Sequence, residues 1–536
     1  MIPVILAVAN LVLVLMLDSK RKKMKNYIYI LIAGILTLTS CDDFLSRSPL
    51  SDLSPENYFT DKAEMKNWNA GIYDAFQDAL SQKQILYGDV RSDNVHTTSY
   101  APDWLYMNAI TPSRNECSWQ AFYQCISRCN IGIEKYPTIP NILESEYAPY
   151  MAQCYGMRAY MYFWATRVWG KLPKITSAWD GSLDNIYVKR SSLEEIKTQI
   201  LKDIDQALKY FQISDISDKY YLSSAAMHAL RTDVYMWYNE YENALNESEY
   251  FIDNDTYELV KDEAEWKNIF LKPGDSKEVI FAMHWDYESN GANSGWPGQL
   301  GASNTNNGFQ MSEEMFIEFI DRLRSGEGAD ARFWNTVDTV KLYYSNSRLP
   351  LTYATYTASG IQKCIKYSDV DPEREYDSTN GVYKSHFAVL NTTDSDQKLV
   401  MYRLANIMLL RAEALNKLNR GDEALDIVND IRTRVGYMKD AKTEVSSVTN
   451  QAEVESIILQ ERQLELYGEG CRWFDLMRTG HLIEVMDPVY SARQEAAGVQ
   501  VTGFGDEGTK YWPINYREFE TNLALKGDQN PPYAER

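Results

Sequence analysis

The chain has few histidines and few of the motifs that enzymes build around reactive side chains. Its five histidines are scattered, at positions 96, 228, 284, 386 and 481, which is poor support for a metal centre or a catalytic triad. It has no phosphate-binding loop, no Gly-x-Ser-x-Gly turn and no His-x-x-x-His pair. The run Gly503–Gly508 matches a dinucleotide pattern, but the Tyr-Trp-Pro that follows cannot open a helix, and Asp506 and Glu507 would repel a pyrophosphate. We expect no cofactor and no metal site.

Basic charge is also scarce, because 54 Lys and Arg stand against 75 Asp and Glu, a formal net charge of −21. Nucleic acid is not expected as a partner, since neutralising its phosphates requires a basic face. Anionic lipid headgroups would repel such a surface as well. Attachment to a membrane therefore requires a covalent or hydrophobic anchor.

None of the seven cysteines forms a Cys-x-x-Cys pair. Cys125 and Cys129 lie one helical turn apart, but no histidine is near them, so we expect small buried residues rather than metal ligands. An oxidising exterior permits disulfides, although the spacing does not say which cysteines would pair.

The amino terminus contains a candidate anchor. A short basic start at Met24–Asn26 precedes an apolar run, Tyr27–Leu36, and the segment Leu38–Cys41 resembles a lipobox that is cut before its cysteine. Small residues before Cys41 and acids after it favour lipidation of Cys41 over a plain signal peptide or a membrane helix with an incidental cysteine.

Residues 1–23 contain a second apolar run that ends in four basic residues, and two signals in tandem are hard to explain physically. We hypothesise that translation starts at Met24, which detection of peptides from residues 1–23 would refute. The predicted organisation is a signal region at 1–40 (lipoprotein signal 24–40), an N-terminal part at 41–270 and a C-terminal part at 271–536. The last two are expected to form one compact body.

Helical periodicity dominates the rest of the chain. Apolar residues recur at helical spacing in 402–415, and after the turn Asn419–Asp422 they recur again to residue 435. In that turn we expect Gly421 to take a left-handed conformation and Asp422 to cap the next helix. Residues 225–237 and 244–252 read as a second helical pair. The pattern predicts a mostly α fold built on tetratricopeptide-like helix pairs, with an irregular, loop-rich face that has little β structure.

Four further helices are predicted from caps and periodicity. One starts at Thr60 or Asp61, one covers 144–169 and is apolar nearly all round, one has a capping box at Ser192 and Glu195, and one opens at Asn450 with a capping box to Glu453.

The last of these helices leads into a charged run, Glu461–Gly480. Glu461 and Glu465 lie one turn apart and close in sequence to Arg472 and Arg478. Two carboxylates so placed could do acid and base work. We favour a partly buried ion-pair network that locks a helix corner, because charges near a core must be paired.

Three segments of the chain resemble the SusD/RagB family of nutrient-binding outer-membrane lipoproteins. They are Tyr402–Ala405, Glu461–Gly480, and Trp512–Ile514 together with Gln529–Tyr533. The chain departs from the family pattern at Pro532, where Gly is more frequent. The resemblance implies a SusD-like fold, a place at the outer face of the outer membrane, and a partner that is a SusC-like TonB-dependent transporter, to which the protein would hand over captured oligosaccharide.

Two segments lack helical periodicity and are rich in aromatic and amide side chains. Residues 85–112 read as an extended piece followed by a loop with exposed aromatics, and 284–310 reads as a long loop rich in Gly, Asn and Ser. Sugars present apolar C–H faces ringed by hydroxyls, so a sugar site needs flat rings surrounded by Asn, Asp and Arg. The candidate ligand-binding residues are Arg91, Asp93, Trp104, Asn108, Trp285, Trp296 and Asn304. The alternative for Trp285 and Trp296 is that they only pin the loop to the body.

We therefore expect a glycan-binding protein rather than an enzyme. The chain is rich in carboxylates, so a glycoside hydrolase is one alternative, in which two of them would flank a cleft. A peptide-binding or purely structural helical-repeat subunit is another.

Overall fold

The computed structural model describes residues 58–81, 83–97, 103–179, 181–182, 186–252, 255–286, 309–328, 330–336, 364, 366–367, 376–377, 382–383 and 398–535. Asp61–Arg536 form one compact unit, separate from Met1–Thr60. The predicted signal region and Cys41 lie outside the described residues. None of the helices in the described ranges combines the length and the apolar character that a membrane span requires.

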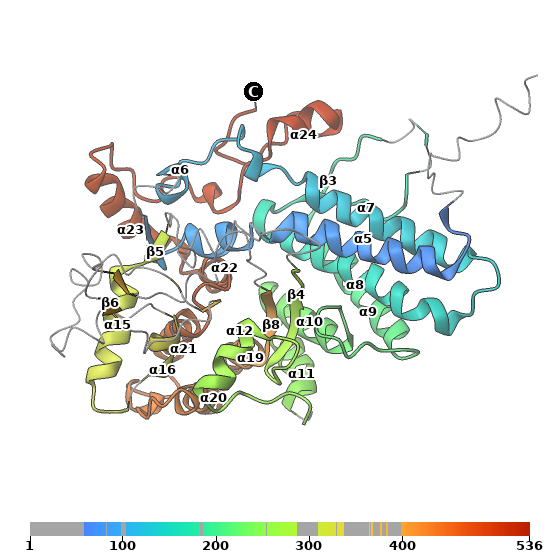
Figure 1. Cartoon of the computed structure of the whole chain (residues 1–536). Coiled ribbons are helices and arrows are strands. Elements are labelled where there is room, and N and C mark those ends of the chain that lie inside the picture. Colours follow the sequence, from blue (N-terminus) through green and yellow to red (C-terminus); the bar gives the residue numbers. More distant parts are fainter. Residues whose placement is uncertain are drawn as a thin grey trace, which may run out of the picture. The chain divides into compact units, whose positions relative to one another are not determined.

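The fold is mostly helical, as predicted (Figure 1). Its helices are α5 (Lys62–Leu80), α6 (Asp103–Tyr106), α7 (Gln120–Lys135), α8 (Glu144–Trp169), α9 (Leu193–Phe211), α10 (Ser224–Trp237), α11 (Tyr241–Ile252), α12 (Glu263–Leu271), α15 (Glu313–Arg324), α16 (Ala331–Thr336), α19 (Leu404–Lys417), α20 (Gly421–Arg434), α21 (Gln451–Glu465), α22 (Arg472–Thr479), α23 (Leu482–Ala496) and α24 (Tyr516–Thr521). Short antiparallel strand pairs join β1 (Val95–Thr97) to β5 (Phe309–Met311), β2 (Leu172–Pro173) to β3 (Arg190–Ser191), β4 (Val279–Met283) to β8 (Leu399–Arg403), and β6 (Tyr376–Asp377) to β7 (Val382–Tyr383).

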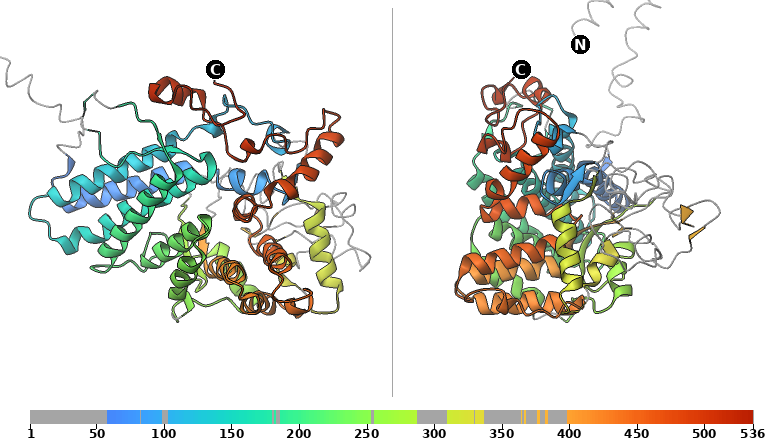
Figure 2. Two further views of the ribbon diagram at one scale, coloured as in Figure 1. Left: turned by 180° about the vertical axis from the view of Figure 1, so that it is seen from behind. Right: turned by 90° about the vertical axis from the view of Figure 1, so that its left-hand side faces the viewer.

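Helices α5, α7, α8 and α9 pack side by side in the N-terminal half (Figures 1 and 2). The predicted starts of two of them are confirmed. Asp61 caps α5 in a capping box with Glu64, and Ser192 does the same for α9 with Glu195. The predicted central helix is also confirmed, because α8 buries nearly every side chain from Met151 to its end.

The predicted helix pairs are α10 with α11 and α19 with α20, and α11 packs on α19 so that the pairs stack. Both connecting turns place an asparagine in the left-handed region, Asn239 at φ 60° and Asn419 at φ 62°. The expected role of Gly421 is therefore wrong. Gly421 is the first residue of α20, where a Cβ would lie only 2.0 Å from the Val448 carbonyl oxygen. Asp422 lies in the first turn of α20 rather than at the cap, and it pairs with Lys442.

The predicted helix at 402–415 begins two residues later than expected. Tyr402 and Arg403 end strand β8, whose residues pair with β4 in a register that places Val279 opposite Arg403 and Met283 opposite Leu399. Both strands are buried along their whole length, so neither shows the alternation by which a half-buried strand is recognised.

Segment 85–112 is more regular than predicted. It contains a π-helix at Leu86–Val90, strand β1 and the short helix α6. Tyr87 and Tyr106 are buried rather than exposed, and the Tyr87 ring packs edge-on against Trp169 and Trp512. Of the Tyr and Trp side chains described in this segment, Trp104 alone is partly open to solvent.

Candidate functional site

The charged run after α21 forms a buried ion-pair cluster. Glu461 Oε1 lies 2.7 Å from Arg332 Nη1, and Glu465 Oε1 lies 2.6 Å from Arg403 Nη1. Both carboxylates are fully buried. The cluster consists of Glu278, Asp330, Glu461, Glu465, Glu469, Arg322, Arg332, Lys366, Arg403, Arg432 and Arg434.

Burial alone would raise the pKa of Glu461 and Glu465, but the surrounding guanidinium groups outweigh it and hold both pKa values well below their usual range. These glutamates stay ionised and hidden from substrate, so the expectation of an ion-pair network is confirmed. Its predicted partners were wrong. Arg472 pairs with Asp93, and Arg478 pairs with Glu413 and Asp475.

Arg91, a predicted ligand contact, lies inside the body and is completely buried. Its guanidinium carbon lies 4.0 Å from the centroid of the Trp473 ring and 5.6 Å from that of Trp512. Nη2 donates to Asn108 Oδ1 at 2.7 Å and to the Thr509 carbonyl at 2.6 Å. Its position gives Arg91 a supporting role, because it is closed off from solvent and its Nη1 and Nη2 groups donate to protein acceptors.

Asn108 joins the segment after α6 to the segment before Trp512. It adopts φ 58°, and its Nδ2 donates to Thr509 Oγ1 at 3.2 Å and to the Phe504 carbonyl at 3.4 Å. Its amide is thus used on both sides, since Oδ1 accepts from Arg91. Asn108 and Arg91 hold two loops that are far apart in sequence against each other.

Trp104 lies in the short helix α6 before Asn108 and is half-buried. The Arg114 guanidinium carbon lies 4.1 Å from the centroid of its ring, and Trp512 packs edge-on at 6.2 Å between centroids. We call Arg91, Trp104, Asn108, Arg114, Trp473 and Trp512 the Trp104 cluster. Arg91, Trp473 and Trp512 are its buried part, and Trp104, Asn108 and Arg114 are partly open to solvent.

Asp93 anchors the same segment to α22. Its carboxylate accepts from Arg472 Nε at 2.9 Å and Nη2 at 2.8 Å, and from Gln463 Nε2 at 3.0 Å. Burial would raise the pKa of Asp93, but the Arg472 charge outweighs it and holds that pKa below its usual range. Asp93 is therefore an ionised strut beneath the surface, with 15% of its side chain exposed.

The other predicted residues lie elsewhere. Trp296, Asn304 and most of the 284–310 loop are outside the described residues. Trp285 is described and is half-buried just beyond β4. It follows His284, whose carbonyl accepts from Gln77 Nε2 on α5. The structure thus brings together Arg91, Trp104 and Asn108, with Asp93 in the same segment, whereas Trp285 follows a residue that contacts α5.

A pocket of about 300 Å³ opens next to His284, and the sequence analysis missed it. We call it the tyrosine pocket; it is lined by Ala70, Tyr73, Asp74, Gln77, Asp218, Tyr220, Tyr221 and His284. The signal that could have revealed the pocket is the pair Tyr220–Tyr221, which lies two residues before Ser223, the cap of α10. These tyrosines lie outside any helical pattern, so the sequence gives no reason to expect that they are buried.

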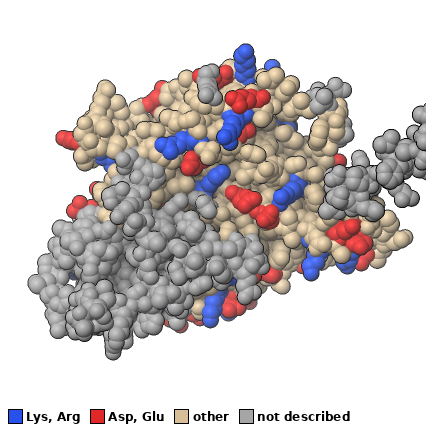
Figure 3. Space-filling view, turned by 45° about the horizontal axis from the view of Figure 1, so that its top comes forward, with Lys and Arg blue, Asp and Glu red and all other residues tan. Residues whose placement is uncertain are grey.

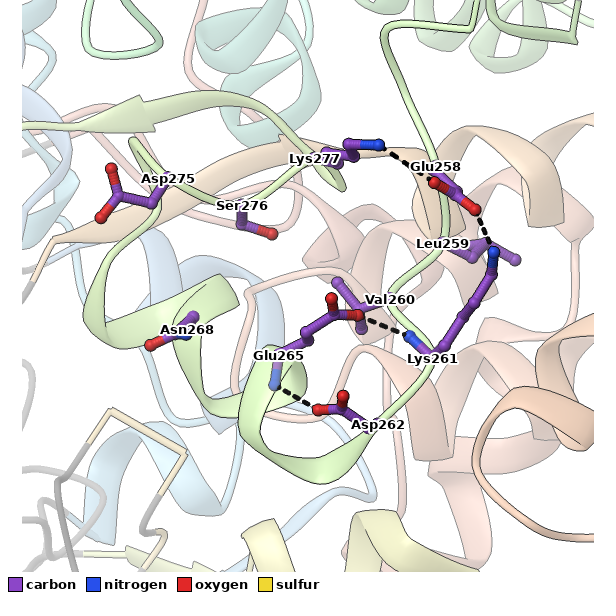
Figure 4. A pocket seen from close by; sticks show the side chains of 10 residues that line it. All are labelled: Glu258, Leu259, Val260, Lys261, Asp262, Glu265, Asn268, Asp275, Ser276 and Lys277. Carbon is purple, nitrogen blue, oxygen red and sulfur yellow. Dashed lines mark hydrogen bonds and ion pairs between the residues drawn. The ribbon is translucent and has the colours of Figure 1, made fainter.

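A larger pocket of about 520 Å³ lies where residues 258–262 meet the start of α12 and residues 275–277 (Figure 4). Four carboxylates and two lysines line it, and most of these residues bind one another. Glu258 pairs with Lys261 and Lys277, while the Lys261 amide donates to Glu265 at 3.0 Å. Without an aromatic ring among its described lining residues, it offers no platform for a sugar face.

Charge is intermixed on the face shown in Figure 3. Lysine, arginine and acidic side chains lie singly or in small groups among uncharged residues over the described part of that face. The described part of that face thus shows no large patch of one sign of charge.

Two family models match the chain. The model described as the SusD family matches residues 277–533, and the one described as starch-binding associating with outer membrane matches residues 43–236. SusD-like protein P38 of Formosa agariphila is 30% identical over 548 residues, which cover 96% of this chain and 100% of the relative.

Solved structures agree in fold. A SusD homolog from Bacteroides thetaiotaomicron has a TM-score of 0.66 at 21% identity, covering 87% of this chain and 97% of that one. A structure described as a laminarin binding SusD-like protein has a TM-score of 0.62 at 20% identity, covering 89% of this chain and 100% of that one. The class is thus the SusD-like helix-pair fold. The chain belongs to the SusD/RagB family, as its motifs indicate.

Proposed function

We propose that this chain is a cell-surface lipoprotein, anchored through Cys41, that binds oligosaccharide and passes it to a SusC-like TonB-dependent transporter without breaking a bond. Support comes from family membership, from a family model described as associating with the outer membrane, and from a relative in fold that is described as laminarin binding. The observation that carries the site is Trp104, an indole that is partly open to solvent and whose position is fixed by Arg114 and Trp512.

The mechanism follows from that rigidity. A sugar ring stacks its C–H face on an indole, and the affinity depends on how little the indole must be ordered on binding. Arg91, Asn108 and Asp93 order the loops beneath Trp104 before any ligand arrives. In this proposal Trp285 and Trp296 contribute further platforms, and Asn304 contributes an amide that can hydrogen-bond to a sugar hydroxyl.

The two acids that the sequence places one helical turn apart, Glu461 and Glu465, do not support hydrolysis. A glycosidase needs one carboxyl group with a raised pKa and a second one facing it across an open cleft. Glu461 and Glu465 are buried, and each contacts several arginines. No observation favours a second function over glycan binding.

A glycan array probed with the chain from residue 41 tests the proposal, followed by titration of the best-bound oligosaccharide. We expect Trp104→Ala to weaken binding about tenfold or more, which is ~1.4 kcal/mol, and Trp104→Phe to lose less. Trp179→Ala is the matched control, because Trp179 is 70% exposed and lies outside the Trp104 cluster. Thermal unfolding of each variant shows whether the fold is intact.

Failure of the wild-type chain to bind any glycan would contradict the proposal, as would sustained shortening of the bound oligosaccharide. Equal losses of affinity for Trp104→Ala and Trp179→Ala would contradict the assignment of the site to Trp104. The partner is tested by purifying the lipidated protein from detergent-solubilised outer membranes, with a TonB-dependent transporter expected in the same complex.

A further inference from the structure

The tyrosine pocket is built from three segments that are far apart in sequence. Helix α5 contributes Ala70, Tyr73, Asp74 and Gln77, which share one face because they recur three to four residues apart. Asp218, Tyr220 and Tyr221 come from the segment before α10, and His284 comes from the end of β4. None of its described lining residues belongs to the Trp104 cluster.

Hydrogen bonds fix these three segments to one another. The Leu222 amide donates to the Tyr73 hydroxyl at 2.8 Å, and Gln77 Nε2 donates to the His284 carbonyl. Asp218 Oδ1 accepts from the Tyr220 amide at 3.0 Å and so holds the turn that presents both tyrosines. The walls are therefore in place before a ligand binds, which lowers the entropic cost of binding.

The aromatic rings of the pocket are arranged edge to face. Tyr73 and Tyr221 have centroids 4.9 Å apart at 75°, and Tyr220 and His284 have centroids 4.9 Å apart at 81°. In such a pair the ring that contributes its edge keeps both of its faces clear of its partner. Tyr221 is 38% exposed, so the pocket combines an accessible phenol with firmly packed neighbours.

The charges of the pocket restrict what it can bind. Asp74 and Asp218 line it, and its described lining contains no lysine or arginine. The Asp74 side chain is 61% exposed, with one oxygen 3.1 Å from Arg128 Nη1. Carboxylates accept hydrogen bonds from hydroxyls but repel a carboxylate or sulfate on a ligand. Burial raises the pKa of Tyr221, so its hydroxyl keeps its proton and can donate.

We propose that the tyrosine pocket is a second sugar site, separate from the Trp104 cluster, which takes one neutral hexose unit and rejects uronic acids and sulfated sugars. The proposal rests on the proposed glycan-binding function. The volume of the pocket lies at the lower end of the ~300–1,000 Å³ range of ligand pockets, which suits a single sugar unit rather than a chain. A branch or end of an oligosaccharide would occupy it.

Saturation-transfer NMR on the chain from residue 41 tests this site with four probes, glucose, galactose, mannose and glucuronate. We expect at least one neutral hexose to bind and glucuronate not to bind. Tyr221→Ala should weaken the binding of that hexose at least about tenfold, the loss of one main contact. Tyr187→Ala is the matched control, because Tyr187 is a similarly exposed tyrosine outside the pocket.

The outcomes separate this proposal from the one on which it rests. If an array oligosaccharide binds and depends on Trp104, while Tyr221→Ala changes no probe or oligosaccharide, the second site is overturned and the glycan function stands. If no glycan of any size binds the wild-type chain, both fall. Glucuronate that binds as tightly as the neutral hexoses would overturn the charge selection. Because Tyr221→Ala removes a contact with Tyr73, Asp74→Lys provides a second test; it should admit glucuronate.

Discussion

The buried ion-pair cluster and the tyrosine pocket both contain carboxylates beside aromatic rings. They differ in whether those carboxylates are exposed enough to contact a ligand. Glu465 is fully buried between three arginines, one of which, Arg403, lies 5.5 Å from the Trp266 ring. Asp74 in the pocket is 61% exposed and contacts a single arginine at the surface. The densely charged part of the sequence thus forms the buried cluster, to which we assign a role in stability. The proposed binding site contains carboxylates that are still exposed to water.

The sharpest way to break this comparison is to remove a charge from the cluster. Arg403→Met leaves Glu278, Glu465 and Glu469 without the guanidinium that contacts all three. We expect a loss of about 3–5 kcal/mol in the free energy of unfolding, measured by urea denaturation. Arg420→Met, which breaks an exposed pair with Glu423, should cost under about 1 kcal/mol. Equal costs for the two variants would contradict the role of the cluster.

Buried acids with opposite pKa shifts should give the protein a stability maximum in mild acid. Burial raises the pKa of Asp89 to about 7, although it accepts from the Gly470 amide and Asn94. Because its folded pKa exceeds its unfolded pKa, its contribution is fully present below the unfolded value and is lost as pH rises through about 7. For Glu461 and Glu465 the sign is reversed, since their lowered pKa values mean that stability falls as pH drops below the usual carboxyl range.

Urea denaturation at about pH 5.5 and about pH 7.5 tests the first half of that profile. We expect the wild type to be more stable at the lower pH by on the order of 2 kcal/mol. Asp89→Asn should show a much smaller difference, because it has no proton to gain. A wild type that is equally stable at both values would contradict the raised pKa.

The next smaller effect concerns the turn between α19 and α20. Gly421→Ala places a Cβ 2.0 Å from the Val448 carbonyl oxygen, and relieving that overlap requires a backbone shift. We expect a loss of about 1–3 kcal/mol in the free energy of unfolding. Gly71→Ala in α5 is the matched control. Its Cβ meets only Arg128 at 3.8 Å, and it should stabilise the chain by about 0.5–1 kcal/mol. A lower stability of Gly71→Ala would contradict the prediction that the room available for a Cβ decides the sign of the effect.

The smallest expected effect on stability is at the pocket itself. Asp74→Asn removes an exposed charge and should change the free energy of unfolding by less than about 0.5 kcal/mol. It should nevertheless weaken the binding of the neutral hexose, because an NH2 donor replaces one of the two carboxylate oxygens that can accept from a sugar hydroxyl. A measurable loss of stability without a change in sugar binding would assign Asp74 to the scaffold.

The sequence was sufficient for the parts of the fold that depend on local interactions. Asp61 and Ser192 cap their helices as expected, because a cap involves only the next three residues. Asn450 also caps α21, but the predicted capping box is not formed. The Glu453 carboxylate accepts from Ser446 instead of from the Asn450 amide. The strand at Tyr402–Arg403 was missed because its partner, β4, lies far away in the sequence.

The same limit explains what was predicted of the site. Trp104, Asn108 and Arg91 were found together because they lie in one segment with no helical periodicity. The burial of Arg91 could not be foreseen, because Trp473, Thr509 and Trp512 come from the far end of the chain. The tyrosine pocket was missed for the same reason, since Tyr73, Tyr221 and His284 meet only in the folded structure.

Calorimetric titration of the chain from residue 41 with the oligosaccharide selected by the array, followed by chromatography of the recovered ligand, tests the central claim most directly. We predict saturable binding, an intact ligand, and an affinity at least about tenfold weaker for Trp104→Ala than for Trp179→Ala. A shortened ligand, or affinities that do not distinguish these two tryptophans, would contradict glycan capture by the fixed indole at the surface.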